Sequence, residues 1–136
     1  MTNHEQNKLE LPNLTLTVFE ETFTIHKFAP SASIPQAVSD CSFYSVIKTR
    51  EEFSLICPGD LSVQSEKSSP NWKCLKVVGP RDLNLTGLIA GLSDILEKAK
   101  ISIFAISTFE TDYLLNQKQS LKAAKNALIS QGYQFK

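Results

Sequence analysis

The chain has 136 residues and a mass of 15.1 kDa, with 14 Lys and Arg residues balanced by 14 Asp and Glu residues. This length predicts one ordinary domain or two very small ones, and a content of 42% hydrophobic and 21% charged residues is typical of a folded protein. A formal net charge of +0 argues against a general nucleic-acid binder. No apolar run approaches the roughly 20 residues that a membrane span needs, and the polar first residues do not resemble a signal peptide. We therefore expect a cytoplasmic protein that binds neither nucleic acid nor membrane.

Three cysteines, Cys41, Cys57 and Cys74, are widely spaced and form no C-x-x-C pair. The two histidines, His4 and His26, do not cluster with them. This pattern indicates neither a disulfide framework nor a metal site, and no motif calls for a cofactor. Each cysteine lies in an apolar stretch, so we expect buried, reduced thiols.

The first half of the chain predicts a small, strand-rich domain over residues 13–65, preceded by a flexible arm over residues 1–12. Alternating apolar and polar residues predict strands over 14–19 and 23–28, and a short helix is expected near 36–40. Strands over 43–47 and 53–57 form a hairpin around the polar turn 49–52. The polar segment 64–71 reads as a linker and marks the boundary.

The second half, residues 70–136, predicts the element order β-α-β-β-α-β. A strand over 72–78 precedes a helix whose apolar face runs from Leu85 to Ala99, and strands over 101–107 and 112–115 follow. Ser120 is the expected N-cap of a second helix, Gly132 is its expected stop, and residues 133–135 form a last strand. This order predicts an α+β, ferredoxin-like domain with an antiparallel sheet and both helices on one face.

The inward faces of these elements predict the core of the second domain. The expected members are Trp72, Leu75, Val77, Leu88, Leu92, Ile103, Ala105, Leu121 and Leu128.

No set of residues in the sequence makes a convincing catalytic site. A nucleophile needs a base within hydrogen-bond reach and a third group that orients the base. Only His26 could serve as such a base, and it reads as a partly exposed strand residue. The carboxylate pairs, such as Glu51 with Glu52, are typical of solvated turns. We therefore expect no catalytic residues.

The turn that leads into the first long helix is a better candidate for ligand binding. The segment 79–87 ends on Thr86 and Gly87, next to backbone N–H groups that have no partner within the helix and that favour an anion such as a carboxylate. Gly87 would leave the backbone open to close approach. The alternative is that Asp82 or Asn84 simply caps the helix.

A second polar segment, 107–113, ends a strand with hydroxyls, an aromatic ring and carboxylates. Together Thr108, Phe109 and Asp112 could enclose a small polar or cationic molecule. The alternative is an ordinary β-turn with solvated acids.

Two long segments carry a resemblance to a known family. The run from Trp72 to Ala90, followed by the run from Ile101 to Leu115, resembles the ACT-domain family related to the animal cytosolic arginine sensors, in the form of a bacterial two-ACT protein. Residues 43–55 fit the same family more loosely. The resemblance covers the chain from about Leu14 onward and implies two tandem ferredoxin-like ACT domains.

The resemblance also implies a site. It implies that free amino acids bind at domain interfaces and that a homodimer would form the site between its two C-terminal domains. Ser102 and Ile103 match positions that hold the ligand's α-amino and carboxylate groups. Thr108 and Phe109 match contacts around the ligand, and Asp112 matches an acid that receives a guanidinium. The loop that closes from the other domain corresponds to Asp82, Leu83, Asn84, Leu85, Thr86 and Gly87, and it lacks an acid next to Thr86, so the resemblance leaves the preference for arginine open.

Three functions follow as hypotheses. The first is a non-catalytic amino-acid sensor or regulatory module that acts as a homodimer. The second is a protein-interaction or assembly module whose ligand pocket is vestigial. An enzyme ranks last, because the sequence offers neither a nucleophile with its base nor a metal set.

Overall fold

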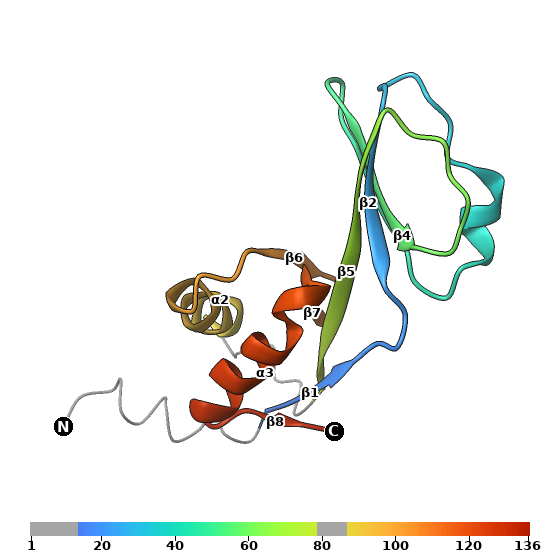
Figure 1. Ribbon diagram of the computed structural model, residues 1–136. Coiled ribbons are helices and arrows are strands. Elements are labelled where there is room, and N and C mark those ends of the chain that lie inside the picture. Colours follow the sequence, from blue (N-terminus) through green and yellow to red (C-terminus); the bar gives the residue numbers. More distant parts are fainter. Residues whose placement is uncertain (1–13, 79–86) are drawn as a thin grey trace. The chain divides into compact units, whose positions relative to one another are not determined.

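The computed structural model describes residues 14–78 and 87–136 and divides the chain into two compact units (Figure 1). The helical unit consists of Met1–Phe19 and Lys73–Lys136. The inserted unit, Glu20–Trp72, lies between these two stretches in the sequence.

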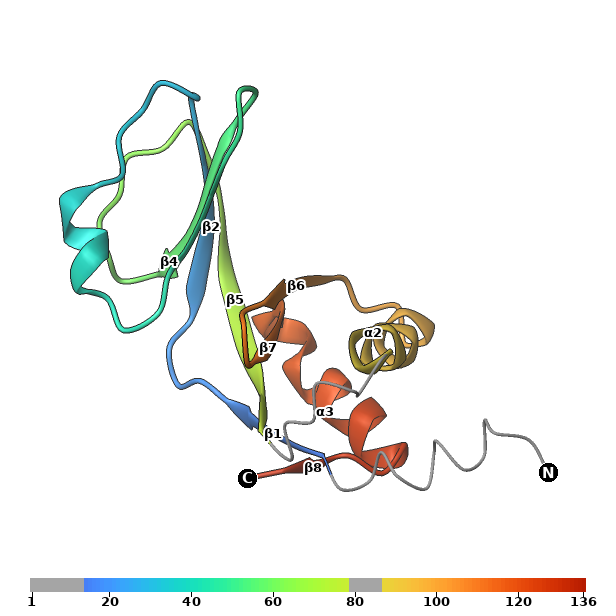
Figure 2. The ribbon, with the colours of Figure 1, turned by 180° about the vertical axis from the view of Figure 1, so that it is seen from behind.

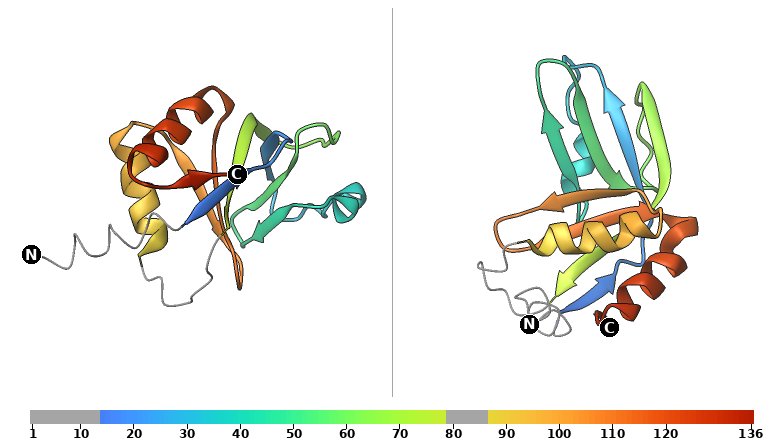
Figure 3. Two further views of the ribbon diagram at one scale, coloured as in Figure 1. Left: turned by 90° about the horizontal axis from the view of Figure 1, so that it is seen from below. Right: turned by 90° about the vertical axis from the view of Figure 1, so that its left-hand side faces the viewer.

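The described part of the helical unit contains an open, mixed sheet. Its strands are β1 (Thr15–Val18), β5 (Lys67–Val78, which begins in the inserted unit), β6 (Ile103–Ser107), β7 (Asp112–Gln117) and β8 (Gln134–Phe135). The strand order is β6-β7-β5-β1-β8. β1 pairs antiparallel with β5 and parallel with β8, so it lies between them (Figure 3). The first strand of the described chain thus completes a sheet whose other strands all come from the second half.

Two helices, α2 (Leu88–Lys98) and α3 (Leu121–Ser130), cover one face of this sheet (Figures 1 and 2). Their apolar stripes, which the spacing of leucines predicts, turn toward the sheet. The buried core between helices and sheet consists of Leu14, Leu16, Leu75, Val77, Leu88, Leu92, Leu96, Ile101, Leu114, Ala124, Leu128 and Tyr133. The region is a mixed α+β fold with an open sheet and two helices, as the sequence predicts.

Both helices end in the same hydrogen-bonded motif. After α3, the Tyr133 N–H donates to the Leu128 carbonyl (3.1 Å) and the Gly132 N–H donates to the Ile129 carbonyl (3.0 Å), with Gly132 at φ 99°. This is a Schellman turn, and it confirms Gly132 as the stop. Ser120 is at the predicted N-cap position of α3, but its side chain makes no capping hydrogen bond there.

The end of α2 repeats this pattern with a different residue at the left-handed position. The Ile101 N–H donates to the Leu96 carbonyl (2.9 Å) and the Lys100 N–H donates to the Glu97 carbonyl (2.8 Å), with Lys100 at φ 62°. The motif buries Ile101 against the core and redirects the chain into β6.

The strands of the inserted unit all pair antiparallel. Its strands are β2 (Phe23–Phe28), β3 (Ser45–Lys48), β4 (Phe53–Pro58) and the first part of β5, in the order β3-β4-β2-β5. The 3-10 helix η2 (Gln36–Asp40) follows β2, and Val38 is its one buried residue. The predicted hairpin is confirmed, since β3 and β4 pair antiparallel from Ser45↔Ile56 to Lys48↔Phe53.

The predicted linker 64–71 is largely a strand, because β5 begins at Lys67 and pairs with β2. The register shifts between Phe23 and Ile25, where Asn71 has φ 66° and Pro70 contributes no N–H. Proline and a left-handed asparagine are both suited to a bulge on a strand. The polar composition of this segment therefore reflects a bulged strand rather than a flexible connection.

The division into units differs from the predicted boundaries. The sequence assigns residues 14–19 to an N-terminal domain over 13–65, but β1 pairs within the helical unit. The reason is that an alternating pattern identifies a strand without identifying its partner. The predicted arm, residues 1–12, lies outside the described residues.

Most of the predicted core is confirmed. Leu75, Val77, Leu88, Leu92 and Leu128 are buried in this core, and Ile103 and Leu121 are half-buried and pack against it. Trp72 is also buried, but it belongs to the inserted unit and not to this core, so that part of the prediction is wrong. Ala105 is exposed, so that prediction is wrong.

Cys57 and Cys74 are buried free thiols, whereas Cys41 is half-buried. Burial, with smaller contributions from Cys41 and Asp60, raises the pKa of Cys57 to about 11, which keeps this thiol protonated.

Candidate ligand-binding site

The first candidate group is the N-terminus of α2. Gly87 is its N-cap, with φ 86°, a left-handed conformation that glycine adopts without a Cβ penalty. No side-chain capping hydrogen bond is made there, and the first turn has no acidic residue. The backbone N–H groups of this turn can therefore attract a carboxylate. The predicted loop residues Asp82, Leu83, Asn84, Leu85 and Thr86 lie outside the described residues, as do the alternative caps.

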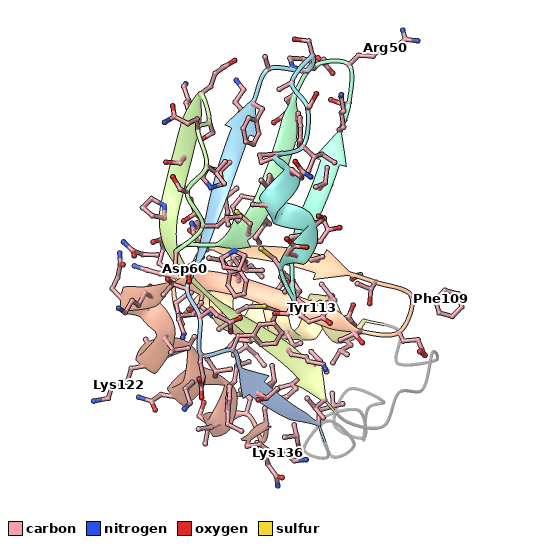
Figure 4. The ribbon with its side chains drawn as sticks, turned by 90° about the vertical axis from the view of Figure 1, so that its right-hand side faces the viewer. Arg50, Asp60, Phe109, Tyr113, Lys122 and Lys136 are labelled. Carbon is pink, nitrogen blue, oxygen red and sulfur yellow. The ribbon has the colours of Figure 1, made fainter. Side chains whose placement is uncertain are left out.

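The second candidate group lies in the turn between β6 and β7. The Thr108 N–H and hydroxyl both donate to the Thr111 carbonyl (2.8 and 3.1 Å), and the Thr111 N–H donates to the Thr108 hydroxyl (3.1 Å). The Thr108 side chain is therefore engaged in the turn itself, as the β-turn alternative predicts. Phe109 is 89% exposed and points outward from the turn (Figure 4).

Asp112 begins β7, directly opposite Ser107 at the end of β6. The Ser107 hydroxyl donates to Asp112 Oδ1 at 2.6 Å, and the Asp112 side chain is half-buried. This hydrogen bond fixes one carboxylate oxygen and leaves the carboxylate able to accept from a cationic donor.

The third candidate group is the start of β6. Ser102 is exposed and Ile103 is half-buried, and Ile103 lies opposite Asn116 of β7. Because β6 pairs only with β7 in the described part of the sheet, its outer edge offers backbone groups to a ligand or to another chain.

These groups fall at two ends of the helical unit. Gly87 and Ser102 flank α2 at its opposite ends, and its 11 residues span about 16 Å. β6 then runs back, so the β6–β7 turn returns to the end where α2 begins (Figure 3). A single copy therefore brings Gly87 toward Thr108 and Asp112 at one end and leaves Ser102 and Ile103 at the other.

The helical unit also contains two buried polar side chains that the sequence did not indicate as candidate functional residues. Asn116 is fully buried, and neither its Nδ2 nor its Oδ1 has a hydrogen-bond partner among the described residues. The Tyr133 hydroxyl is also buried without a partner there, and burial raises its pKa. The sequence signals are slight: Asn116 follows the apolar pair Leu114 and Leu115, and Tyr133 follows the helix-stopping Gly132.

The inserted unit holds the histidine that the sequence predicts to be partly exposed. His26 is only 6% exposed, so that expectation is wrong, and burial lowers its pKa. Its Nδ1 lies 2.8 Å from the Ser65 hydroxyl, which itself donates to the Lys67 carbonyl (3.1 Å). The neutral ring therefore donates from Nδ1 to Ser65.

Within the described ranges 14–78 and 87–136, no group of three or more His, Cys, Asp and Glu side chains could hold a metal ion. The helices in those ranges are also too short or too polar to span a membrane.

Comparison with known proteins now adds to this geometry. An ACT domain is found in the chain: residues 67–130, from the start of β5 to the end of α3, match the family model described as ACT domain. The comparison with curated proteins gives no match. The resemblance to the arginine sensors stays a prediction.

Solved structures share the fold over most of the chain. A protein from Agobacterium tumefaciens is 28% identical, with a TM-score of 0.85 and coverage of 92% of this chain and 93% of that one. A Vibrio cholerae protein described as a possible transport protein is 13% identical, with a TM-score of 0.74 and coverage of 96% and 99%. The regulatory subunit of aspartate kinase from Thermus thermophilus is 12% identical, with a TM-score of 0.61 and coverage of 85% and 95%.

Proposed function

We propose that this chain is a non-catalytic regulatory module that binds a free amino acid between the C-terminal domains of a cytoplasmic homodimer. The match of residues 67–130 to the ACT domain supports a regulatory, amino-acid-binding role, as does the fold shared with an aspartate kinase regulatory subunit. The inserted unit would be a second ACT-like domain, since both sheets follow the same strand order once β1 is set aside.

The observation that carries this proposal is the separation of the candidate groups. Gly87, Thr108 and Asp112 lie at one end of the helical unit, whereas Ser102 and Ile103 lie beyond the far end of α2. In a two-fold dimer, one end of each copy would meet the other end of its partner. The helix N-terminus would then take the α-carboxylate, and β6 of the other copy would bind the rest of the ligand's backbone. Phe109 would supply an apolar wall.

The direct test is a thermal-shift screen with the twenty amino acids, combined with sedimentation at micromolar protein concentration. A ligand that binds only the folded state raises the melting temperature by mass action. We expect a dimer and at least one amino acid that raises the melting temperature. A monomer that binds an amino acid would contradict the shared site.

Asp112 would be the counter-charge for a basic ligand. Loss of one member of a buried charge pair costs about 2–5 kcal/mol, so Asp112→Ala should weaken arginine or lysine binding at least tenfold in calorimetry. Glu110→Ala, in the adjacent turn, is the matched control and should bind normally. Equal affinity of Asp112→Ala and the parent for the best basic ligand would remove Asp112 from the site.

A protein-interaction module with a vestigial pocket is the second candidate. The internal hydrogen bonds of Thr108 and the 89% exposure of Phe109 favour it, because they engage the Thr108 hydroxyl within the turn and present an aromatic ring to solvent. A dimer that no amino acid stabilises would favour this alternative over the sensor.

A further inference from the structure

The starting observation is the buried amide of Asn116. In folded proteins, buried polar atoms are almost always hydrogen-bonded, because an unpaired amide in the interior has lost its water and gained nothing in exchange. Asn116 has no exposed surface, and its donor and its acceptor both lack a partner among the described residues. By contrast, His26 of the inserted unit is also buried but is hydrogen-bonded to Ser65.

The position of Asn116 relates this amide to the candidate site. In the β6–β7 ladder it lies directly opposite Ile103, so the two side chains share one face of the sheet. That face is the helix-covered one, since Leu114, two residues earlier, belongs to the core and Ile103 packs against it. Asn116 therefore lies under the start of β6, next to the backbone proposed to hold the ligand.

A ligand can reach this amide only if the start of β6 moves. β6 is paired on one side only in the described sheet, and Ser102 just before it is exposed. A small displacement of this edge would give a ligand access to Asn116 without breaking the central pairs of the sheet.

We propose that Asn116 is a ligand-binding residue of this site and reads the zwitterionic head of an α-amino acid. Its carbonyl oxygen accepts from the ligand's α-ammonium, and its NH₂ group donates to the ligand's α-carboxylate. An amide offers one acceptor and one donor group side by side, which matches adjacent ammonium and carboxylate groups and is indifferent to the ligand's side chain. This inference rests on the proposed function and extends it by naming the part of the ligand that is read.

The test is Asn116→Leu, which keeps the number and branching of the side-chain heavy atoms and removes the hydrogen-bonding groups. Replacing an unpaired buried amide by an apolar group should leave the melting temperature of the ligand-free protein unchanged or higher. Affinity for the amino acid found in the screen should fall at least tenfold in calorimetry. The loss should be similar for every amino acid that binds the parent, unlike the loss caused by Asp112→Ala.

Two further variants keep the test decisive. Asn126→Leu makes the same chemical change on the exposed face of α3 and should bind as the parent does. If Asn116→Leu fails to fold, Asn116→Val, with a smaller side chain suited to a strand, replaces it and should show the same loss. If a folded Asn116 variant binds amino acids as tightly as the parent, this inference is overturned and the proposed function stands. If no amino acid binds the parent, the proposed function itself fails.

Discussion

The strands of the two units follow the same order, but different elements connect and cover them. In the helical unit, α2 and α3 follow the first and third strands of the β-α-β-β-α-β order and cover one face. In the inserted unit, η2 takes the place of the first helix, and the loop 59–66 takes the place of the second. Leu61 and Val63 of that loop pack against a small core of Phe28, Val38, Phe53, Leu55 and Cys57. One strand order can thus be stabilised by two helices or by a single helical turn and a loop.

The largest expected effect tests the helical unit. Leu92 is fully buried at the centre of α2, so Leu92→Ala should lower the free energy of unfolding by about 2–5 kcal/mol in urea denaturation. Ile129→Ala is the control, since Ile129 of α3 is 50% exposed and its truncation should cost well under half as much. A cost for Leu92→Ala as small as that of the control would show that α2 is not docked.

In the inserted unit, a single buried side chain, that of Val38, anchors the 3-10 helix η2. Val38 is the single buried residue of η2, so Val38→Ala removes two buried methyl groups and should cost about 2 kcal/mol. Hydrogen exchange should become faster in η2 and stay unchanged in α2, which three buried leucines anchor. Equal acceleration in both elements would mean that the units do not differ in this way.

The pH dependence should also distinguish the units, through His26. Burial lowers the pKa of folded His26 below its ordinary value of 6.5, so the unfolded chain takes up a proton in a range where the folded protein does not. The free energy of unfolding should therefore fall as the pH drops from about 6.5 to the lowered pKa of folded His26. Urea denaturation at about pH 7.5 and at about pH 5.5 should show a smaller loss for His26→Gln than for the parent. An identical loss in both proteins would assign the pH dependence to other groups.

The smallest effect concerns the ends of the two helices. Lys100 and Gly132 occupy the same left-handed position, which costs a residue with a Cβ about 1 kcal/mol. Lys100→Gly should therefore raise the free energy of unfolding by up to about 1 kcal/mol, and Gly132→Ala should lower it by about as much. Thermal denaturation measures both, and a destabilised Lys100→Gly variant would contradict the shared motif.

The parts of this fold that local chemistry controls were predictable from the sequence. The leucine stripe of α2 and the stop at Gly132 follow from short-range periodicity and backbone freedom. The partner of β1 was not predictable, because alternation does not specify pairing. The prediction of a linker over 64–71 was wrong for a related reason, because Ser, Pro and Asn are common both in linkers and in bulged strands.

The candidate site could be predicted only in part. Gly87 and Asp112 are local features, and they lie at the starts of α2 and β7, as the sequence pattern predicts, whereas their roles in ligand binding stay predictions. The burial of Asn116 and His26 depends on which face of the sheet is covered, and the sequence pattern does not show whether their side chains lie on that face.

The place of β1 between β5 and β8 has a consequence for the rate of folding. Thr15 is paired with Gln134, and the Lys136 N–H donates to the Leu16 carbonyl at 3.0 Å, so residues near opposite ends of the described sequence must meet to complete this sheet. Pairings of such large sequence separation form slowly, because the loop entropy is lost before the contacts form. The pairings of the inserted unit, from the β3–β4 hairpin to the pairing of β2 with β5, join residues that lie closer together in the sequence than Thr15 and Gln134 do. The inserted unit should therefore become protected against hydrogen exchange first during refolding, with the β1–β8 pairing among the last contacts to form.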